Sequence, residues 1–176
     1  MSSPNTANGV ENEGMGVDQR ETLNIFHPET ILTQNFSPLT PSSCRMTYTF
    51  PAYRKMQDYL PHVTMPQIHE AIFEGLFLTT AHVIRTGALQ LPLSYEIFLV
   101  HRLQAIIREE QLKFRQMLSP QTPADLVMSL RSSEIRKRFA AITIGVEGFV
   151  EGEVTFLIPL TLISPNTTPI PPPQSP

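Results

Sequence analysis

The sequence predicts an α+β domain in which a curved antiparallel sheet wraps around one long central helix. A segment from Thr64 to Gly87 carries the start and stop signals of a helix and is apolar around most of its circumference. After Tyr95 the pattern changes to β-type runs joined by short connections, which favour antiparallel hairpins. A helix that is apolar on nearly all sides must be covered on nearly all sides, and a curved sheet covers it.

The predicted central helix is marked at both ends. Thr64, followed three residues later by Gln67, forms a capping-box pattern, and Pro66 falls in the first turn, where proline is tolerated. Gly87 suits the position that follows a helix. These signals enclose about 22 residues, or roughly 33 Å of helix at about 1.5 Å per residue.

The segments on either side of this helix predict strands. Residues 45–53 alternate and carry β-formers, so we expect a short strand that Pro51 ends, and residues 54–63 then connect it to the helix. Residues 95–100 are apolar and β-prone, and we expect a strand there too. Residues 103–118 fit a helical period as well as alternation, and we favour a strand with a bulge. The helical alternative would make the chain a helical adaptor.

The final third of the chain predicts three more strands. Residues 126–131 alternate, and residues 139–146 place Ile142, Ile144 and Val146 on one face. A turn at 147–148 follows. The last strand has one apolar face, formed by Val150, Val154, Phe156 and Ile158.

The length of 176 residues suits one domain, but composition predicts that the ends lie outside it. Residues 1–43 lack sustained periodicity, so we expect a low-order N-terminal segment. Residues 44–163 form the predicted domain, and residues 164–176 are a proline-rich tail that we expect to be disordered. The net charge of −3 gives no general attraction to nucleic acid or to anionic lipid.

Several classes of site are disfavoured by the sequence. The single cysteine, Cys44, allows neither an internal disulfide nor a cysteine-based zinc site, and we expect a buried or incidental thiol. We find no glycine-rich phosphate loop, nucleophile elbow or histidine-metal spacing, so we expect no metal and no cofactor. No apolar stretch reaches the ~18 residues of a membrane span and the N-terminus does not resemble a signal peptide, so we expect a cytoplasmic protein.

The order of strand, buried helix and antiparallel strands resembles the hot-dog fold of acyl-thioester thioesterases and dehydratases. The chain is most similar to the FcoT-type long-chain fatty acyl-CoA thioesterases, some of which are assigned to adding glycine to an enoyl group on an acyl carrier protein. Residues 73–76 (FEGL) resemble the Phe-Asn-Gln-Leu of that family's central helix. Residues 101–121 resemble the strand that follows it, with its Phe-Arg…Leu-Asn-Pro-Gln ending, and residues 65–74 also resemble the helix of hot-dog dehydratases.

The resemblance implies an acyl-thioester enzyme, and the chain departs from it at identifiable positions. The asparagine that holds the thioester in that family falls at Glu74, so an amide donor is replaced by a group that only accepts when ionised. One of the family's tyrosines corresponds to Tyr59. Its N-terminal tyrosine has no counterpart in residues 1–43.

Two carboxylates on the predicted helix are the first candidates for catalysis. Glu70 and Glu74 lie one turn apart, either on a solvated stripe or in a site. Phe77, Leu78 and Ala81 fall in the same sector, and a second subunit of a hot-dog homodimer would cover them. A carboxylate that is partly desolvated in such a cleft has a raised pKa and acts as a general base. Glu74 is the preferred candidate and Glu70 the next.

Polar residues near the helix are further candidates. His62 and Tyr59 precede it and either lie in an ordinary loop or supply donors where backbone amides stabilise an oxyanion. His101 starts the long segment that we expect to pair along the helix, and it is either catalytic or structural. His69 points away from the carboxylates, and we expect it to be packed or hydrogen-bonded in the core, with a catalytic role as the less favoured alternative.

A group of basic residues is the candidate site for the phosphates of coenzyme A or phosphopantetheine, which arginine binds in bidentate fashion. The alternative is a solvated strand edge that charge protects from aggregation. The residues are Arg131, Arg136, Lys137 and Arg138, with Arg108 and Arg115.

These observations predict a hot-dog thioesterase, acting as a homodimer on a fatty or polyketide acyl group carried by coenzyme A or an acyl carrier protein. The alternatives are a dehydratase, isomerase or Michael-addition enzyme on the same carrier, and a non-catalytic module that binds a lipid or a protein. A helix carboxylate suits chemistry at an α-proton, which favours the first alternative, and the missing family residues favour the second.

Overall fold

The computed structural model describes residues 17–52, 54–55, 58–59 and 62–161. In chain order its elements are α1 (Gln19–Leu23), the 3-10 turn η1 (Pro28–Thr30), β1 (Thr33–Thr40), β2 (Ser43–Tyr48), β3 (Arg54–Lys55), β4 (Asp58–Tyr59), α2 (Met65–Arg85), α3 (Tyr95–His101), the 3-10 turn η2 (Arg102–Gln104), β5 (Ile106–Phe114), β6 (Ala124–Arg136), β7 (Phe139–Gly148) and β8 (Val150–Pro159).

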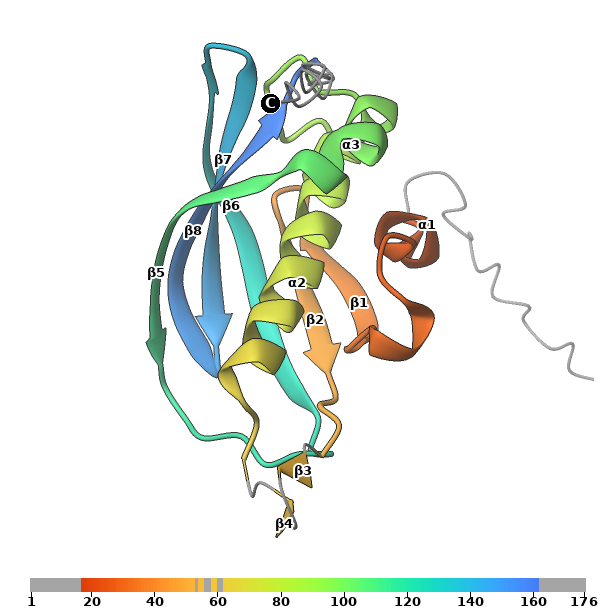
Figure 1. Ribbon diagram of the computed structural model, residues 1–176. Coiled ribbons are helices and arrows are strands. Elements are labelled where there is room, and N and C mark those ends of the chain that lie inside the picture. The colour runs from red at the N-terminus through yellow and green to blue at the C-terminus, as the bar shows by residue number, and fades with distance from the viewer. Residues whose placement is uncertain (1–16, 53, 56–57, 60–61, 162–176) are drawn as a thin grey trace, which may run out of the picture.

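A six-stranded antiparallel sheet curves around α2 (Figure 1). The strand order is β1-β2-β6-β7-β8-β5, so β5, which follows α2 and α3, joins the far edge beside β8. β3 and β4 form a separate two-stranded ladder beyond the start of α2. The predicted α+β class and the hot-dog arrangement of a sheet wrapped around a central helix are confirmed.

α2 begins and ends where the sequence predicts. The side-chain oxygen of Gln67 accepts hydrogen bonds from the backbone amide and the hydroxyl of Thr64, both at 2.9 Å. Gly87 ends the helix with a φ of +71°, a conformation that glycine adopts without steric cost. Most of the helix is buried, including the residues from Gly75 to Val83. The sheet and the N-terminal segment together cover it.

The core lies between α2 and the concave face of the sheet. Ile142, Ile144 and Val146 of β7 are buried on this face, as predicted. The predicted apolar face of β8 is likewise buried. Cys44 on β2 is buried against Thr79 of α2, and burial raises the pKa of its thiol to about 11. This confirms the expectation of a buried thiol.

Residues 95–100 do not form the predicted strand but lie in α3. The side chain of Ser94 caps this helix by accepting a hydrogen bond from the amide of Ile97 at 3.3 Å. Phe98 and His101, three residues apart, are buried on one face. The cap and the burial of one helical face outweigh the β-propensity of the sequence. The next segment forms η2 and then β5, whose bulge between Ile107 and Glu109 agrees with the prediction for residues 103–118.

The N-terminal segment differs from the prediction for residues 1–43, because residues 19–40 contain α1, η1 and β1. β1 forms a hairpin with β2, and Leu23 and Leu32 are buried in the core. β1 is an edge strand with mostly exposed polar side chains, so its sequence lacks the alternation of a half-buried strand. Residues 1–16 and the predicted disordered tail, 164–176, lie outside the described residues.

Among the helices that the structure describes, none has the length and apolar character needed to cross a bilayer.

Gly152 allows β8 to pair closely with β5. Its φ is +146°, and an added Cβ would lie 1.9 Å from the carbonyl oxygen of Gln111. We expect Gly152→Ala to lower the free energy of unfolding by about 2–4 kcal/mol, because backbone strain and overpacking add. Gly87→Ala is the matched control, since its φ is also positive but no atom lies within 4 Å, and we expect a loss of about 1 kcal/mol. Urea denaturation measures both, and equal losses would contradict the steric argument.

Candidate functional site

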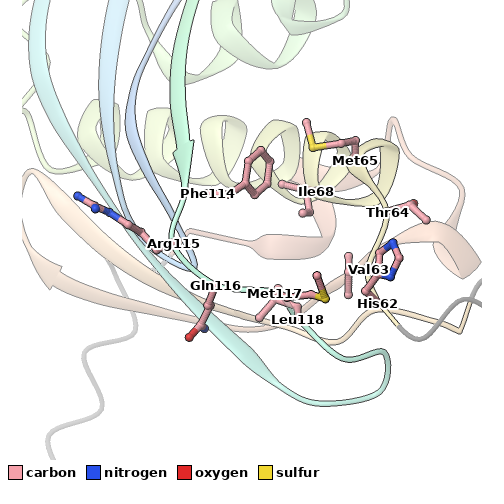
Figure 2. Close-up of a pocket in the computed structure, with 10 residues that line it drawn as sticks. All are labelled: His62, Val63, Thr64, Met65, Ile68, Phe114, Arg115, Gln116, Met117 and Leu118. Carbon is pink, nitrogen blue, oxygen red and sulfur yellow. The ribbon is translucent and has the colours of Figure 1, made fainter.

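A cavity of about 510 Å³ lies at the N-terminus of α2, between this helix and the segment that follows β5 (Figure 2). Figure 2 shows Met65, Ile68 and Phe114 on one side of it and Val63 and Met117 on the other. The full lining is His62, Val63, Thr64, Met65, Ile68, Phe114, Arg115, Gln116, Met117 and Leu118. We call it the α2 pocket, and its volume is typical of a small-molecule site.

Two connections form the walls of the α2 pocket. The backbone amide of Val63 donates to the carbonyl of Leu118 at 2.9 Å, which fixes the entry to α2 against the segment after β5. Val63, Ile68 and Leu118 are buried at its base. Met65 and Met117 are exposed at its rim, Met117 to 82%. The pocket therefore offers a flexible, apolar surface, because methionine side chains adapt to a ligand's shape.

Two polar side chains of the α2 pocket, those of His62 and Thr64, lie where the helix starts. The first-turn amides of a helix have no intrahelical acceptors, and their dipoles favour negative charge. His62 lines the same end. The hydroxyl of Thr64 is engaged with Gln67. Arg115 points away from the cavity in Figure 2 and pairs with Glu151. The pocket thus combines an apolar cavity, one imidazole and a helix N-terminus.

Glu74 lies outside this pocket and is only 1% exposed. One carboxylate oxygen accepts a hydrogen bond from the amide of Leu32 at 2.9 Å. The other accepts from the amide and the hydroxyl of Thr33, at 2.8 and 2.6 Å. Burial raises the pKa of Glu74, these bonds partly offset the rise, and the charge of Glu70 adds to it. The carboxylate holds the start of β1 against α2.

The face of α2 around Phe77 is covered by the chain's own N-terminal segment, where the sequence predicted a second subunit. The ring of Phe26 lies 6.1 Å from that of Phe77, and Phe98 of α3 lies 6.2 Å from it on another side. The prediction that Glu74 lies in a cleft at a subunit interface is therefore wrong. The residues after α1 lie across α2, and the backbone amides of Leu32 and Thr33 bind the Glu74 carboxylate there.

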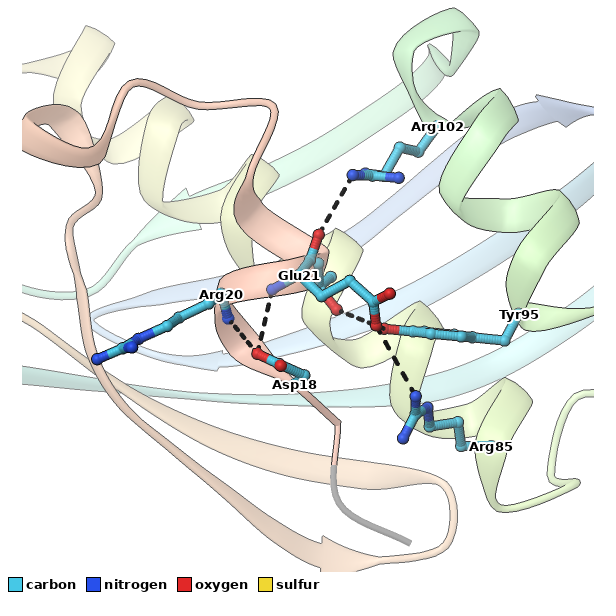
Figure 3. A network of polar contacts seen from close by, with 7 residues as sticks. Asp18, Arg20, Glu21, Arg85, Tyr95 and Arg102 are labelled. Carbon is cyan, nitrogen blue, oxygen red and sulfur yellow. Dashed lines mark hydrogen bonds and ion pairs between the residues drawn. The ribbon is translucent and has the colours of Figure 1, made fainter.

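A polar network holds α1 in place over α2 and α3 (Figure 3). The hydroxyl of Tyr95 donates to the Glu21 carboxylate at 2.9 Å, and the guanidinium of Arg85 lies 3.9 Å from the same carboxylate and 4.1 Å from the Tyr95 ring centroid. The guanidinium of Arg102, a buried residue, donates to the backbone carbonyl of Glu21 and to Asn24. These contacts explain why so short a helix is ordered.

Glu70 is exposed and lines a second cavity, of about 390 Å³, on the side of α2 that faces the start of β1. Glu29 and Gln121 line it too. His62 belongs to the α2 pocket. The structure therefore separates Glu70 from His62, on two sides of the same helix.

The remaining predicted residues lie elsewhere. His101 is buried, with Nδ1 2.6 Å from the carbonyl oxygen of Pro159, and it joins α3 to β8 at the far end of α2. His69 is half exposed and bonds to Glu110 of β5 at 3.0 Å, so its predicted place in the core is wrong. Tyr59 lies in β4, and its side chain is outside the described part of the structure.

The predicted basic cluster is dispersed. Arg131 pairs with Glu147 at 2.7 Å, and Arg136 pairs with Glu134. Arg136, Lys137 and Arg138 lie at the tip of the β6–β7 hairpin, which Figure 1 shows at the opposite end of the sheet from the start of α2. Arg115 is the one residue of the group that lines the α2 pocket. Within residues 17–161, as far as they are described, no three His, Cys, Asp or Glu side chains gather as a metal site would require.

The sequence did not indicate the partners of Glu74 or the lining of the α2 pocket. Leu32 and Thr33 lie in the segment predicted to be of low order, and they bind Glu74 mainly through backbone amides, which any residue carries. Phe114 and Met117 lie some 50 positions from Met65 along the chain. The available signal for them was the presence of large apolar residues at and just after the end of a charged strand.

No protein-family model and no curated protein matches the chain. Among solved structures, it resembles Cj0977, a sigma28-regulated virulence protein from Campylobacter jejuni, at 11% identity over 83% of this chain and 98% of that one, with a TM-score of 0.48. An HP0420 homologue from Helicobacter felis is 10% identical over 90% and 96% of the chains, with a TM-score of 0.46. A thioesterase superfamily protein is 14% identical over 70% of this chain, with a TM-score of 0.41, and the chain spans only 54% of its length. Because these TM-scores lie below 0.5, the assignment of the fold is based on the strand order and the central helix.

Removing the Glu74 carboxylate leaves three buried donors without an acceptor. We expect Glu74→Ala to lower the free energy of unfolding by about 3–5 kcal/mol. Glu70→Ala, one turn away on the same helix but exposed, serves as the control with an expected change within about 0.5 kcal/mol. Equal effects of the two substitutions in urea denaturation would refute the structural role of Glu74.

The raised pKa of Glu74 links folding to proton uptake. The folded chain binds this proton more tightly than the unfolded chain, whose carboxyl has a pKa near 4.5. The contribution of Glu74 to stability therefore falls as pH rises from about 4.5 through the folded pKa. We expect Glu74→Gln to have a flatter profile of unfolding free energy across this window than the wild type. Parallel profiles between pH 4.5 and 8 would show that Glu74 takes up no proton on folding.

Proposed function

We propose that the chain is an acyl-thioester hydrolase, active as a homodimer on fatty or polyketide acyl groups carried by coenzyme A or an acyl carrier protein. The observation that carries the proposal is the apolar α2 pocket at the N-terminus of a long buried helix. The hot-dog fold agrees with it, although fold alone does not give function. The reaction needs only water besides the substrate.

The acyl chain occupies the apolar part of the α2 pocket. Val63, Ile68 and Leu118 provide a buried apolar base, and Phe114 and Met117 contact the chain near the rim. Among the described residues that line the cavity, Arg115 is the one with a permanently charged side chain, and it is paired with Glu151. Each buried methylene stabilises the complex by about 0.8 kcal/mol.

The thioester group lies at the start of α2. The amide of Met65 and the dipole of α2 stabilise the negative charge that develops on the carbonyl oxygen when water attacks. Pro66 has no N–H, and the amide of Gln67 is bonded to the Thr64 side chain. His62 takes a proton from the attacking water as its oxygen bonds to the carbonyl carbon. The carbon–sulfur bond then breaks, His62 returns the proton to the sulfur, and the acyl group leaves as the free acid and the carrier as a thiol. Glu70 is the second candidate base, although it lines the other cavity.

A non-catalytic acyl-binding module is the second candidate, and one observation favours it. The helix carboxylate Glu74, at the position of the asparagine in the resembling family, is buried and accepts three hydrogen bonds. It is therefore held in a structural role. The same observation weakens a dehydratase, isomerase or Michael-addition enzyme, because Glu70 is then the one carboxylate of the Glu70/Glu74 pair left for chemistry at an α-proton.

Turnover of a series of acyl-coenzyme A and acyl-carrier thioesters tests the proposal. We expect KM to fall about fourfold per added methylene until the pocket is full. His62→Ala should lower kcat by at least about 100-fold, while His69→Ala, a histidine outside the pocket, should leave it unchanged. Equal rates for both variants would refute the role of His62. Absence of turnover, with binding of free fatty acids that tightens with chain length, would replace the hydrolase by the binding module.

A further inference from the structure

Three basic residues form the tip of the β6–β7 hairpin, at the end of the sheet away from the α2 pocket (Figure 1). They are Arg136, Lys137 and Arg138, and all three are exposed. Glu134 pairs with Arg136 and offsets one of the three charges. An excess of two positive charges therefore remains at this basic tip, although the whole chain carries a net charge of −3.

Exposed aliphatic side chains lie at the same end of the domain. Four of them recur at a spacing of three residues through α3, η2 and the start of β5, and they are Ile97, Val100, Leu103 and Ile106. Leu103 is the most exposed of these, at 71%. Ile135, beside Arg136 on the hairpin, is 51% exposed. This end of the domain thus presents both aliphatic and basic side chains to water.

The end of β8 joins the basic tip to the aliphatic residues. The carbonyl oxygen of Arg138 accepts a hydrogen bond from the amide of Leu160, just after β8, at 2.8 Å. Nδ1 of His101, the last residue of α3, lies 2.6 Å from the carbonyl oxygen of Pro159 in β8. Ile106 at the start of β5 also pairs with β8. The basic tip and the five aliphatic residues therefore border one another around one strand end, and we call them together the distal surface.

We propose that the distal surface docks on a bilayer of anionic lipids, with the basic tip among the headgroups and the aliphatic side chains inserted between them. Anionic lipids give a bilayer a negative surface potential that attracts clustered Lys and Arg. The strength of such peripheral binding grows with the apolar area that is inserted and with the electrostatic attraction, and the distal surface offers both. The proposal does not depend on hydrolysis, because it concerns the end of the domain opposite the α2 pocket.

The distribution of the aliphatic side chains favours a bilayer over an acidic protein as the partner. They come from four separate elements, α3, η2, β5 and β6, and none of them lines either of the two cavities described above. A protein partner places its main anchors in complementary pockets, whereas a fluid bilayer accepts separate side chains without a matching shape. The length of α2, roughly 30 Å, would keep the α2 pocket away from the lipid and open to a soluble ligand.

Co-sedimentation of the full chain with lipid vesicles tests the electrostatic part. We expect the chain to bind vesicles of equimolar phosphatidylcholine and phosphatidylserine, less at high salt, and to bind phosphatidylcholine alone only weakly. Lys137→Glu changes the tip by two charges, so we expect the partition coefficient to fall about 25-fold, at about fivefold per charge. Lys113→Glu is the matched control, because Lys113 is exposed on β5 roughly 24 Å along the strand from Ile106, beyond the Debye length of about 8–10 Å. We expect it to change binding by less than about twofold.

A second pair of variants tests the apolar part with the same vesicles. Leu103→Gln removes the most exposed aliphatic side chain of the distal surface, and we expect the partition coefficient to fall about tenfold. Met117→Gln is the matched control, because Met117 is 82% exposed but lies at the other end of β5. We expect it to leave vesicle binding unchanged. Circular dichroism checks that all four variants are folded.

Four outcomes would overturn the proposal. The first is a full chain that does not bind the mixed vesicles at millimolar lipid, or equal losses for Lys137→Glu and Lys113→Glu. Binding to polyglutamate in place of vesicles would assign the distal surface to an acidic protein. Vesicle binding that requires removal of residues 162–176 would assign the surface to that segment of the chain. Dissociation of a dimer by Leu103→Gln, with vesicle binding unchanged, would assign it to a second copy.

Discussion

The attachment of the N-terminal segment to α2 through the Glu74 carboxylate is the interaction on which the rest of the structure depends. Three donors from the start of β1 meet one buried acceptor, so the chain that precedes the sheet is fixed at a single point of the helix. Each of these donors, if it were left without an acceptor, would lower the free energy of unfolding by about 1–3 kcal/mol. From that point, α1 and Phe26 cover one face of α2, and β1 forms the border of the sheet.

This attachment determines which surfaces remain for function. Because the N-terminal segment covers α2 near Phe77, the helix is accessible chiefly at its N-terminus, beside Met65 and Glu70. The two cavities described above lie on either side of this end of α2. The interior carboxylate thus holds the fold together, and the open helix end borders the two cavities.

The sequence predicted the parts of the fold whose signals are local. α2 was identified from Thr64, Pro66 and Gly87, and β7 and β8 from the alternation of their buried residues. α3 was missed because residues 95–100 are strong β-formers and its helical signal is a single capping serine. β1 was missed because an edge strand with exposed polar side chains resembles a loop in sequence.

The candidate site was less predictable, since it depends on contacts between distant segments. His62 was identified because it precedes a helix N-terminus, which is a local signal. The role of Glu74 depends on backbone amides about 40 positions away, and sequence shows the carboxylate but not its donors. The arginines at 131–138 are adjacent in sequence but lie on a hairpin far from the pocket.

The hydrogen bond between Val63 and Leu118 has an evolutionary consequence. It joins two connections, the entry to α2 and the exit from β5, and these connections form the walls of the α2 pocket. Loops tolerate insertions, since doubling the length of a loop raises the entropic free-energy cost of closing it by only about 0.6 kcal/mol. The pocket can therefore change in width and depth among descendants of this chain while the helix and the sheet remain as they are.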